Sequence, residues 1–277
     1  MTINRILLVV FSLFILTGSG IRENNDRTRN FPKTEIKPGI IPEKENVWVF
    51  IMAGQSNMAG RGLVEPRDTI PSERVFAINK NGELLLAKEP LNFNEPSMAG
   101  LDCGLSFGKE LLEHIPDSIS ILLIHTAVGG SSINQWVNDS TFRNVTLLSN
   151  FREKVKTAQK YGTIKGILWH QGETDASTAE TIELYPGQLT RLFSKFRNEI
   201  NNLSLPIFIG ELGTFSKTDD SWQAINKQIH SYVMTDKNAF VITTKDLKDK
   251  GDRVHFNSVG QRLMGQRFAK AFVRALN

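Results

Sequence analysis

The sequence has very little cysteine, because Cys103 is the only one among its 277 residues. No disulfide can therefore form within the chain, and no cluster of cysteines can bind a metal. The motif His-Glu-x-x-His, which marks many zinc enzymes, is absent too. The fold must therefore be stabilised by its hydrophobic core.

Blocks of like charge are also missing. The 33 Lys and Arg residues and the 29 Asp and Glu residues are interspersed, so the formal net charge of +4 is spread along the chain. Nucleic acids are usually bound by clusters of basic residues. We therefore expect no nucleic-acid partner. Internal repeats and low-complexity stretches are absent as well.

The N-terminal hydrophobic run is shorter than the roughly 20 residues that a bilayer-spanning helix needs. Residues 6–17 are almost wholly apolar, follow the basic Arg5 and precede small residues at positions 18–20. This order is typical of a cleaved signal peptide. We expect residues 1–20 to be removed and the protein to be exported, to the periplasm or outside the cell, without stable membrane insertion.

The length of the chain and its hydrophobic content of 40% suit one large α/β domain. Residues 21–45 are rich in Arg, Asn, Lys, Glu and Pro, and such a segment cannot order itself independently. We expect it to be a flexible tether. The folded domain is expected to span residues 46–277.

Short apolar runs alternate with segments of helical periodicity along this domain. Strands are expected at residues 46–52, 120–125, 164–169, 206–210 and 239–243, and helices at residues 105–114, 144–161, 179–201, 219–234 and 257–276. This alternation predicts a parallel sheet with right-handed crossovers and helices on both faces. Since such sheets bind ligands at the carboxyl ends of their strands, the chemistry is expected in the loops that follow strands.

Ser56 lies where the first buried strand gives way to a glycine-flanked turn. This position can expose its hydroxyl and place its backbone N–H at a helix N-terminus. A serine attacks a carbonyl only when a neighbouring base takes its proton. The alternative is that Ser56 merely caps a helix.

Asp252 and His255 can supply that base, because the carboxylate can bond the imidazole Nδ1–H and leave Nε2 facing the serine. The spacing Asp-x-x-His alone is a weak signal, also met in solvated loops. Chain order separates the known architectures. An α/β-hydrolase has its serine mid-chain in Gly-x-Ser-x-Gly, whereas here Met58 stands in place of the second glycine. Chymotrypsin-like and subtilisin-like enzymes place the serine last.

Four motifs in this order resemble the SGNH (GDSL-type) hydrolases. They are MAGQSNMAGRG at residues 52–62, TAVGGSS at 126–132, WHQGETD at 169–175, and Asp-x-x-His at 252–255. The first three resemble the sialate O-acetylesterase-like and acetylxylan esterase branch, carbohydrate esterase family 6. The resemblance covers roughly residues 46 to 275.

The resemblance implies a three-layer α/β/α sandwich with a mainly parallel, flavodoxin-like sheet, and an esterase that needs neither metal nor organic cofactor. It implies Ser56 as nucleophile, His255 as general base and Asp252 as its orienting acid. The oxyanion would be held by the backbone N–H groups of Ser56 and Gly130 and by the side-chain amide of Gln171. The sequence departs from the wider superfamily in having Gly-Gln-Ser for Gly-Asp-Ser, and Gln-Gly-Glu for Gly-x-Asn-Asp.

Several neighbouring residues have two interpretations each. Glu173 could influence His255 as a second carboxylate or hold loop N–H groups together, and we favour the supporting role, which we also expect for Gln55. Arg61 could bond the substrate or form an ion pair. Trp136 and Trp169 could form a wall that stacks on sugar rings, or belong to the core.

These features together predict a serine esterase that hydrolyses O-acetyl groups from oligo- or polysaccharides through an acyl-enzyme, of acetylxylan esterase or sialate O-acetylesterase type. One alternative is a GDSL-type lipase or thioesterase acting on longer acyl chains, which would require an apolar acyl tunnel. Another is a carbohydrate-binding protein whose catalysis has lapsed.

Overall fold

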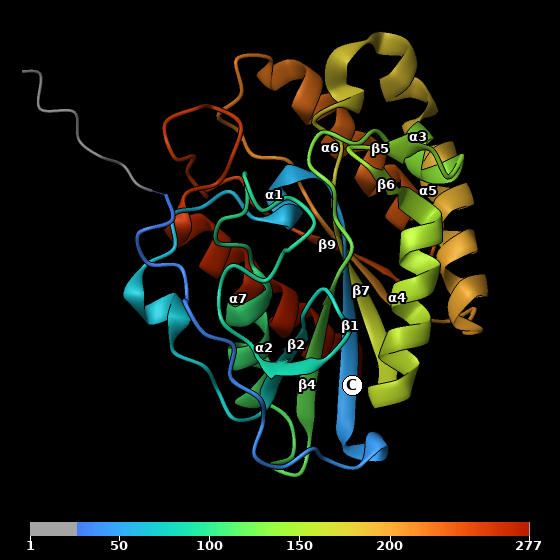
Figure 1. Cartoon of the computed structure of the whole chain (residues 1–277). Helices are drawn as coiled ribbons and strands as arrows, with labels where there is room; N and C mark the ends of the chain where they lie inside the picture. The colour runs from blue at the N-terminus through green and yellow to red at the C-terminus, as the bar shows by residue number, and fades with distance from the viewer. Residues whose placement is uncertain (1–26, 277) are drawn as a thin grey trace, which may run out of the picture.

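The computed structural model describes residues 27–276, and the predicted signal peptide at residues 1–20 lies outside them. A seven-stranded sheet forms the centre of the fold, with the strand order β3-β2-β4-β1-β7-β8-β9 (Figure 1). The five predicted strands are present and parallel. They are β1 Val47–Gly54, β4 Ser120–His125, β7 Thr163–His170, β8 Ile207–Gly210 and β9 Ala239–Ile242.

The two strands at one edge were not predicted. β2 Val75–Ile78 is parallel to β4, whereas β3 Leu84–Leu86 is antiparallel to β2. The two strands are joined by a tight turn in which Gly82 has a φ of +77°. No strand was expected between residues 53 and 119.

Helices cover both faces of the sheet and make three layers (Figure 1). On one face, α2 Gly104–Leu112 and α7 Ser258–Leu276 pack against each other. On the other face lie α4 Leu147–Tyr161, α5 Ala179–Ile200 and α6 Asp219–Val233. Successive side chains of β1 enter the two cores in turn, with Ile51 on the α4–α6 side and Phe50 on the α2–α7 side. The predicted three-layer α/β/α fold is thereby confirmed.

Short elements fill the loops between these helices and strands. They are η1 Lys44–Asn46, α1 Ser56–Ala59, η2 Pro66–Thr69, α3 Ile133–Val137, η3 Asp175–Ser177, and the hairpin of β5 Thr141–Phe142 and β6 Val145–Thr146. Three of them, α1, α3 and η3, come from the loops that follow β1, β4 and β7. Short helices therefore gather at the carboxyl edge of the sheet.

Residues 27–45 lie against the domain, in contrast to the free tether that their composition suggests. Asn30 Nδ2 donates to the Val64 carbonyl at 2.9 Å, and the Leu86 N–H donates to the Ile36 carbonyl at 2.8 Å. Most side chains of this segment are exposed or half-buried. The segment is thus ordered by hydrogen bonds to the domain, because it has no core of its own.

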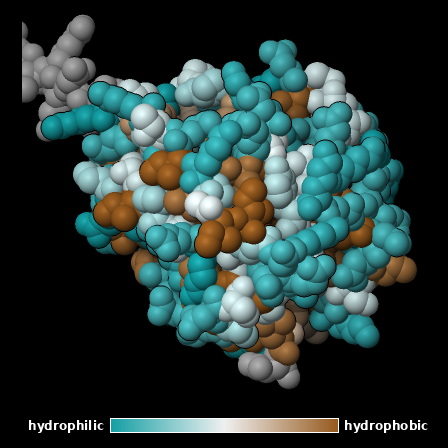
Figure 2. Space-filling view, turned by 60° about the horizontal axis from the view of Figure 1, so that its bottom comes forward, coloured by the Kyte–Doolittle hydropathy of each residue, from teal (hydrophilic) through white to brown (hydrophobic). Residues whose placement is uncertain are grey.

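Figure 2 turns the lower end of the molecule in Figure 1 toward the viewer. This face is mainly hydrophilic, and its apolar residues form several separate groups. In the part of the chain that the structure describes, none of the helices combines the length and the apolar character required for a membrane crossing.

Candidate active site

The nucleophile candidate Ser56 is the first residue of α1, immediately after β1. β1 ends at Gly54, where a Cβ would stand 2.0 Å from the His170 carbonyl oxygen, so only glycine allows β1 to approach β7 this closely. The chain then turns through Gln55 into the short helix. Ser56 is 7% exposed, so its hydroxyl lies at the floor of a cleft.

The structure brings Ser56, His255 and Asp252 together. His255 Nε2 lies 3.0 Å from Ser56 Oγ, and His255 Nδ1 lies 2.7 Å from Asp252 Oδ2. Because a carboxylate only accepts hydrogen bonds, it fixes the proton on Nδ1 and leaves Nε2 free to accept the serine proton. This is the arrangement that activates a serine hydroxyl.

Asp252 is held as a carboxylate by its own loop. Its Oδ1 accepts hydrogen bonds from the N–H groups of Val254 at 2.9 Å and His255 at 2.8 Å. Partial burial alone would raise the pKa of Asp252, but the backbone N–H and ring of His255, followed by the Val254 N–H, lower it to about 2. The carboxylate is therefore ionised over the whole range in which enzymes commonly work.

Gly130 lines the same cleft as Ser56 and His255. It has a φ of +79°, a conformation that favours glycine. Its carbonyl accepts the Thr174 hydroxyl at 3.1 Å, which fixes the orientation of the following peptide. The Ser56 N–H belongs to the first turn of a helix, where backbone donors have no acceptor within the helix. Both residues predicted to supply backbone donors thus line the cleft.

Gln171 does not reach the cleft, and this corrects the role expected for its side chain. It is fully buried, and its Nε2 donates to Gln55 Oε1 and to the Ser131 carbonyl, each at 3.1 Å, and to Asp175. The Tyr185 hydroxyl donates to its Oε1 at 3.1 Å. With its amide hydrogens committed to these acceptors, the Gln171 side chain braces loops and is not aimed at an oxyanion.

Gln55 supports the loop that follows β7. Besides the Gln171 amide, its Oε1 faces the N–H groups of Gly172 at 3.4 Å and Thr174 at 3.3 Å. Burial chiefly raises the pKa of the Asp175 carboxyl, against hydrogen bonds from Gln171 and Ile133 that lower it. This buried network ties the loops after β1, β4 and β7 to one another.

Glu173 and Asn57 form a second network beside the nucleophile. Asn57 Nδ2 donates to Glu173 Oε1 at 2.7 Å, and both residues are almost fully buried. The structure therefore places the Glu173 carboxylate on Asn57 and not on His255, in agreement with a supporting role. The sequence reasoning did not single out Asn57, although it stands next to Ser56 in the first motif.

One wall of the cleft is positively charged. Glu95 lies between Arg61 and Arg143, each at 2.9 Å, so the two guanidinium groups and one carboxylate leave one unit of positive charge. Burial alone would raise the pKa of Glu95, but Arg61, the Gly129 N–H and Arg143 lower it. Arg61 is thus a buried ion-pair partner, whereas the Arg143 side chain is 40% exposed.

The cleft has a volume of about 440 Å³. The residues that line it are Gln55, Ser56, Arg61, Met98, Gly129, Gly130, Arg143, Glu173, Thr174, Ser216, Thr218, Trp222, Val254 and His255. The aromatic side chain among them is that of Trp222. Trp136 and Trp169 are fully buried and pack edge to face in the core, with ring centroids 5.6 Å apart.

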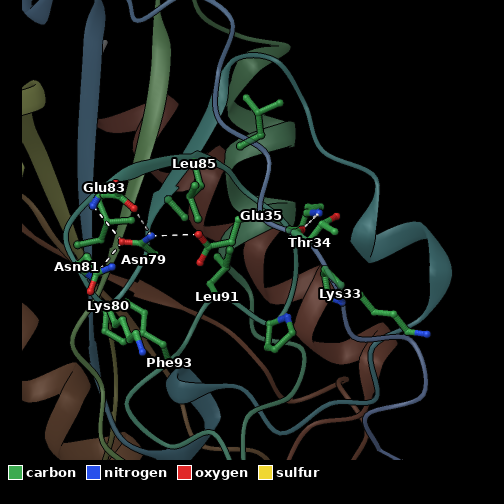
Figure 3. Close-up of a pocket in the computed structure, with 16 residues that line it drawn as sticks. Lys33, Thr34, Glu35, Asn79, Lys80, Asn81, Glu83, Leu85, Leu91 and Phe93 are labelled. Atoms are coloured by element: carbon green, nitrogen blue, oxygen red, sulfur yellow. Dashed lines mark hydrogen bonds between the residues drawn. The ribbon is translucent and has the colours of Figure 1, made fainter.

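A second pocket, of about 430 Å³, lies at the β2–β3 edge and contains none of the predicted site residues (Figure 3). Asn79 at its centre donates to Glu35 at 3.1 Å and to Glu83 at 2.9 Å.

Within residues 27–276, no group of three or more His, Cys, Asp or Glu side chains could hold a metal ion. The cleft at Ser56 is therefore the candidate active site.

Solved structures of low sequence identity share this fold. One from Arabidopsis thaliana has a TM-score of 0.74 at 24% identity, over 83% of this chain and 98% of that one. The structure of NanS has a TM-score of 0.69 at 18% identity, over 86% and 99%. A carbohydrate acetylesterase from Xanthomonas citri has a TM-score of 0.63 at 21% identity, over 84% and 57%.

Sequence comparison identifies the family. A probable carbohydrate esterase of Arabidopsis thaliana is 26% identical over 269 residues, which are 91% of this chain and 98% of the relative. The family model described as "Carbohydrate esterase, sialic acid-specific acetylesterase" matches residues 46–274. A carbohydrate acetylesterase is a carboxylic ester hydrolase, and its substrates are acetylated carbohydrates. This chain belongs to the sialic acid-specific acetylesterase family of carbohydrate esterases.

Proposed function

We propose that Ser56 is the nucleophile of this esterase, that His255 is its general base and acid, and that Asp252 orients the imidazole. The observation that carries the proposal is the continuous chain of contacts from Asp252 Oδ2 to His255 Nδ1 at 2.7 Å, and from His255 Nε2 to Ser56 Oγ at 3.0 Å. A helix cap at Ser56 would need no such chain.

In the first half of the reaction, Ser56 Oγ attacks the acetyl carbonyl as its proton passes to His255 Nε2. The negative charge that develops on the carbonyl oxygen is stabilised by the backbone N–H groups of Ser56 and Gly130. Removing one such donor typically costs about 3 to 4 kcal/mol of transition-state stabilisation. His255 then gives its proton to the sugar oxygen, the C–O bond breaks and the acetyl group stays on Ser56.

In the second half, water attacks the acetyl-serine. His255 takes a proton from this water, the second tetrahedral intermediate collapses, and the proton returns to Ser56 Oγ as acetate leaves. Asp252, with its pKa of about 2, stabilises the imidazolium that forms in both halves. The residues of this chain therefore suffice for both steps as written.

We propose acetylated oligo- or polysaccharides as the substrates, and a place in carbohydrate esterase family 6. The charged and hydroxyl side chains that line the cleft, among them Arg143, Thr174 and Thr218, support a hydroxylated leaving group. The signal-peptide pattern of residues 1–20 supports export.

Acetate release from acetylated xylan and from O-acetylated sialic acid would test this proposal, with the wild type beside Ser56→Ala. We expect release from at least one sugar substrate and its loss in the variant at unchanged thermal stability. Mass spectrometry of the quenched wild type should find an acetyl group on Ser56. Full activity of Ser56→Ala would overturn the mechanism, and a preference for a long-chain aryl ester would overturn the substrate assignment.

A further inference from the structure

Asn57 pairs with the chain on both sides of His255. Its Nδ2 donates to the Val254 carbonyl at 3.0 Å, and its Oδ1 accepts the Phe256 N–H at 3.0 Å. These two groups belong to the two peptide units that flank His255. The carboxamide thus bonds to the catalytic loop much as a neighbouring strand would, at two points.

This pairing joins the loop of the base directly to the helix of the nucleophile. Asn57 follows Ser56 in α1 and is 1% exposed. Its backbone carbonyl accepts Gln261 Nε2 of α7 at 2.9 Å, which fixes α1 from the other side. Any movement of His255 away from Ser56 would therefore break hydrogen bonds in a buried, closely packed place.

Two other contacts join the catalytic loop to the domain: Lys250 Nζ donates to the Arg61 carbonyl at 3.2 Å, and the buried Phe256 ring packs on His170 and Phe215. Residues 251–254 are exposed, and Asp252 belongs to the same loop as His255, so it orients the ring without fixing the distance to Ser56. The Lys250 N–H bonds to the His255 carbonyl at 2.9 Å, but this bond too stays within the loop. Asn57 differs from these contacts because it bonds to both peptide units beside His255 and directly follows Ser56.

Glu173 favours the same orientation of the Asn57 carboxamide as the two backbone groups do. A carboxylate only accepts hydrogen bonds, so its Oε1 at 2.7 Å requires the nitrogen of Asn57 on that side. With the nitrogen there, the oxygen faces the Phe256 N–H. Glu173 comes from the loop after β7, so three loops meet at this carboxamide.

We propose that Asn57 is a positioning residue that holds His255 Nε2 against Ser56 Oγ, and that Glu173 orients Asn57. This inference rests on the proposed function of Ser56 and His255. Proton transfer from Ser56 Oγ to His255 Nε2 depends on the distance between these two atoms. A misplacement of 1 Å can cost about 10²-fold in rate. Substrate binding does not depend on it.

The test is the steady-state kinetics of acetate release by Asn57→Ala and Glu173→Gln. We expect kcat to fall about 100-fold in Asn57→Ala, with less than a twofold change in KM. In Glu173→Gln we expect a smaller fall of the same kind. Combining the two should add nothing to Asn57→Ala alone, because Glu173 acts through Asn57.

Asn226→Ala is the matched control. The Asn226 carboxamide makes the same two-point pairing, with the N–H and carbonyl of Leu212 at 2.8 and 3.0 Å, and it is likewise buried. Its loss should lower thermal stability and leave kcat near the wild-type value. An equal fall of kcat in Asn226→Ala and Asn57→Ala would overturn the proposal.

The outcomes separate this inference from the mechanism on which it rests. An active Ser56→Ala would overturn the mechanism itself. If Ser56→Ala is inactive and Asn57→Ala keeps a kcat within twofold of the wild-type value, the positioning role alone is overturned. If Asn57→Ala does not fold, Glu173→Gln decides, since an unchanged kcat in that variant would overturn the proposal.

Discussion

Gln171 Nε2 donates to Gln55 Oε1 at 3.1 Å, so the two glutamines tie the loop after β7 to the loop after β1 below the floor of the cleft. A glutamine amide at this place in the sequence motif is expected to face the substrate. In this chain it faces inward, toward Asp175 and the Tyr185 hydroxyl. The side chain therefore contributes to the stability of the site and not to the stabilisation of an oxyanion.

Gln171→Ala should accordingly reduce stability more than activity. The substitution leaves buried partners unsatisfied, among them the Asp175 carboxylate, at a cost of about 1 to 3 kcal/mol in the free energy of unfolding. Denaturant unfolding and acetate release measure the two effects. A hundredfold loss of kcat at unchanged stability would instead show that the amide acts on the oxyanion.

Asp252→Asn should lower kcat by about 10³- to 10⁴-fold, because an amide can donate to Nδ1 and stabilise the wrong imidazole tautomer. Asp249→Asn is its control in the same loop. Asp249 accepts the N–H groups of Gly251 at 2.8 Å and Arg253 at 2.7 Å without touching His255. Equal losses of kcat in the two variants would mean that Asp252 acts only by shaping the loop.

Gly130→Ala should lower kcat beyond its effect on folding. A Cβ at Gly130 would have no neighbour closer than 3.7 Å, but the φ of +79° costs a residue other than glycine about 1 to 2 kcal/mol. Relief of that strain would rotate the N–H away from the oxyanion.

Gly82 is a matched control that lies in the turn between β2 and β3 and does not line the cleft. It has a φ of +77°, and a Cβ there would also have its nearest neighbour at 3.7 Å. Gly82→Ala should show a similar fall in Tm with normal kcat, and equal kcat values would exclude Gly130 as a donor.

The Glu89 carboxyl should contribute less to the free energy of unfolding as the pH rises. Complete burial raises the pKa of Glu89 well above its ordinary value, and the nearby Asp102 and Asp68 raise it further. A carboxyl with a raised pKa holds its proton in the folded state, so its contribution to stability is present below about pH 4.3 and is lost as the pH rises toward the folded pKa. Urea unfolding at pH 5 and pH 8 should show a smaller loss of stability in Glu89→Gln than in the wild type. Parallel losses would contradict this prediction.

The sheet could be predicted where apolar strands alternate with segments of helical periodicity. β1, for example, is a continuous apolar run whose residues from Val49 to Ala53 are fully buried. The edge strands β2 and β3 escaped prediction because they form an antiparallel pair with no helix between them, outside that alternation. The hairpin at residues 141–146 escaped because each of its strands has two residues.

The sequence predicted which loops form the site, because the motifs follow strands whose carboxyl ends lie at one edge of the sheet. The four motifs and their order led to the expectation of a triad of Ser56, Asp252 and His255, and the structure places the three side chains together. Which way a side chain turns is decided by its neighbours in space, as Gln171 shows by turning toward Tyr185. Asn57 escaped notice because its partners, Val254 and Phe256, are backbone groups far along the chain, and no residue type signals them.

Ser56 and His255 are 199 positions apart, and the Asn57 contacts join the same two distant segments. A ribosome therefore completes Ser56 long before it reaches His255, and the growing polypeptide carries an unactivated serine during most of its synthesis. Hydrolytic competence then arises in a single late event, the docking of α7 and the loop before it. A chain that ends just before residue 252 would contain all seven strands and lack Asp252 and His255, so we expect it to have no esterase activity.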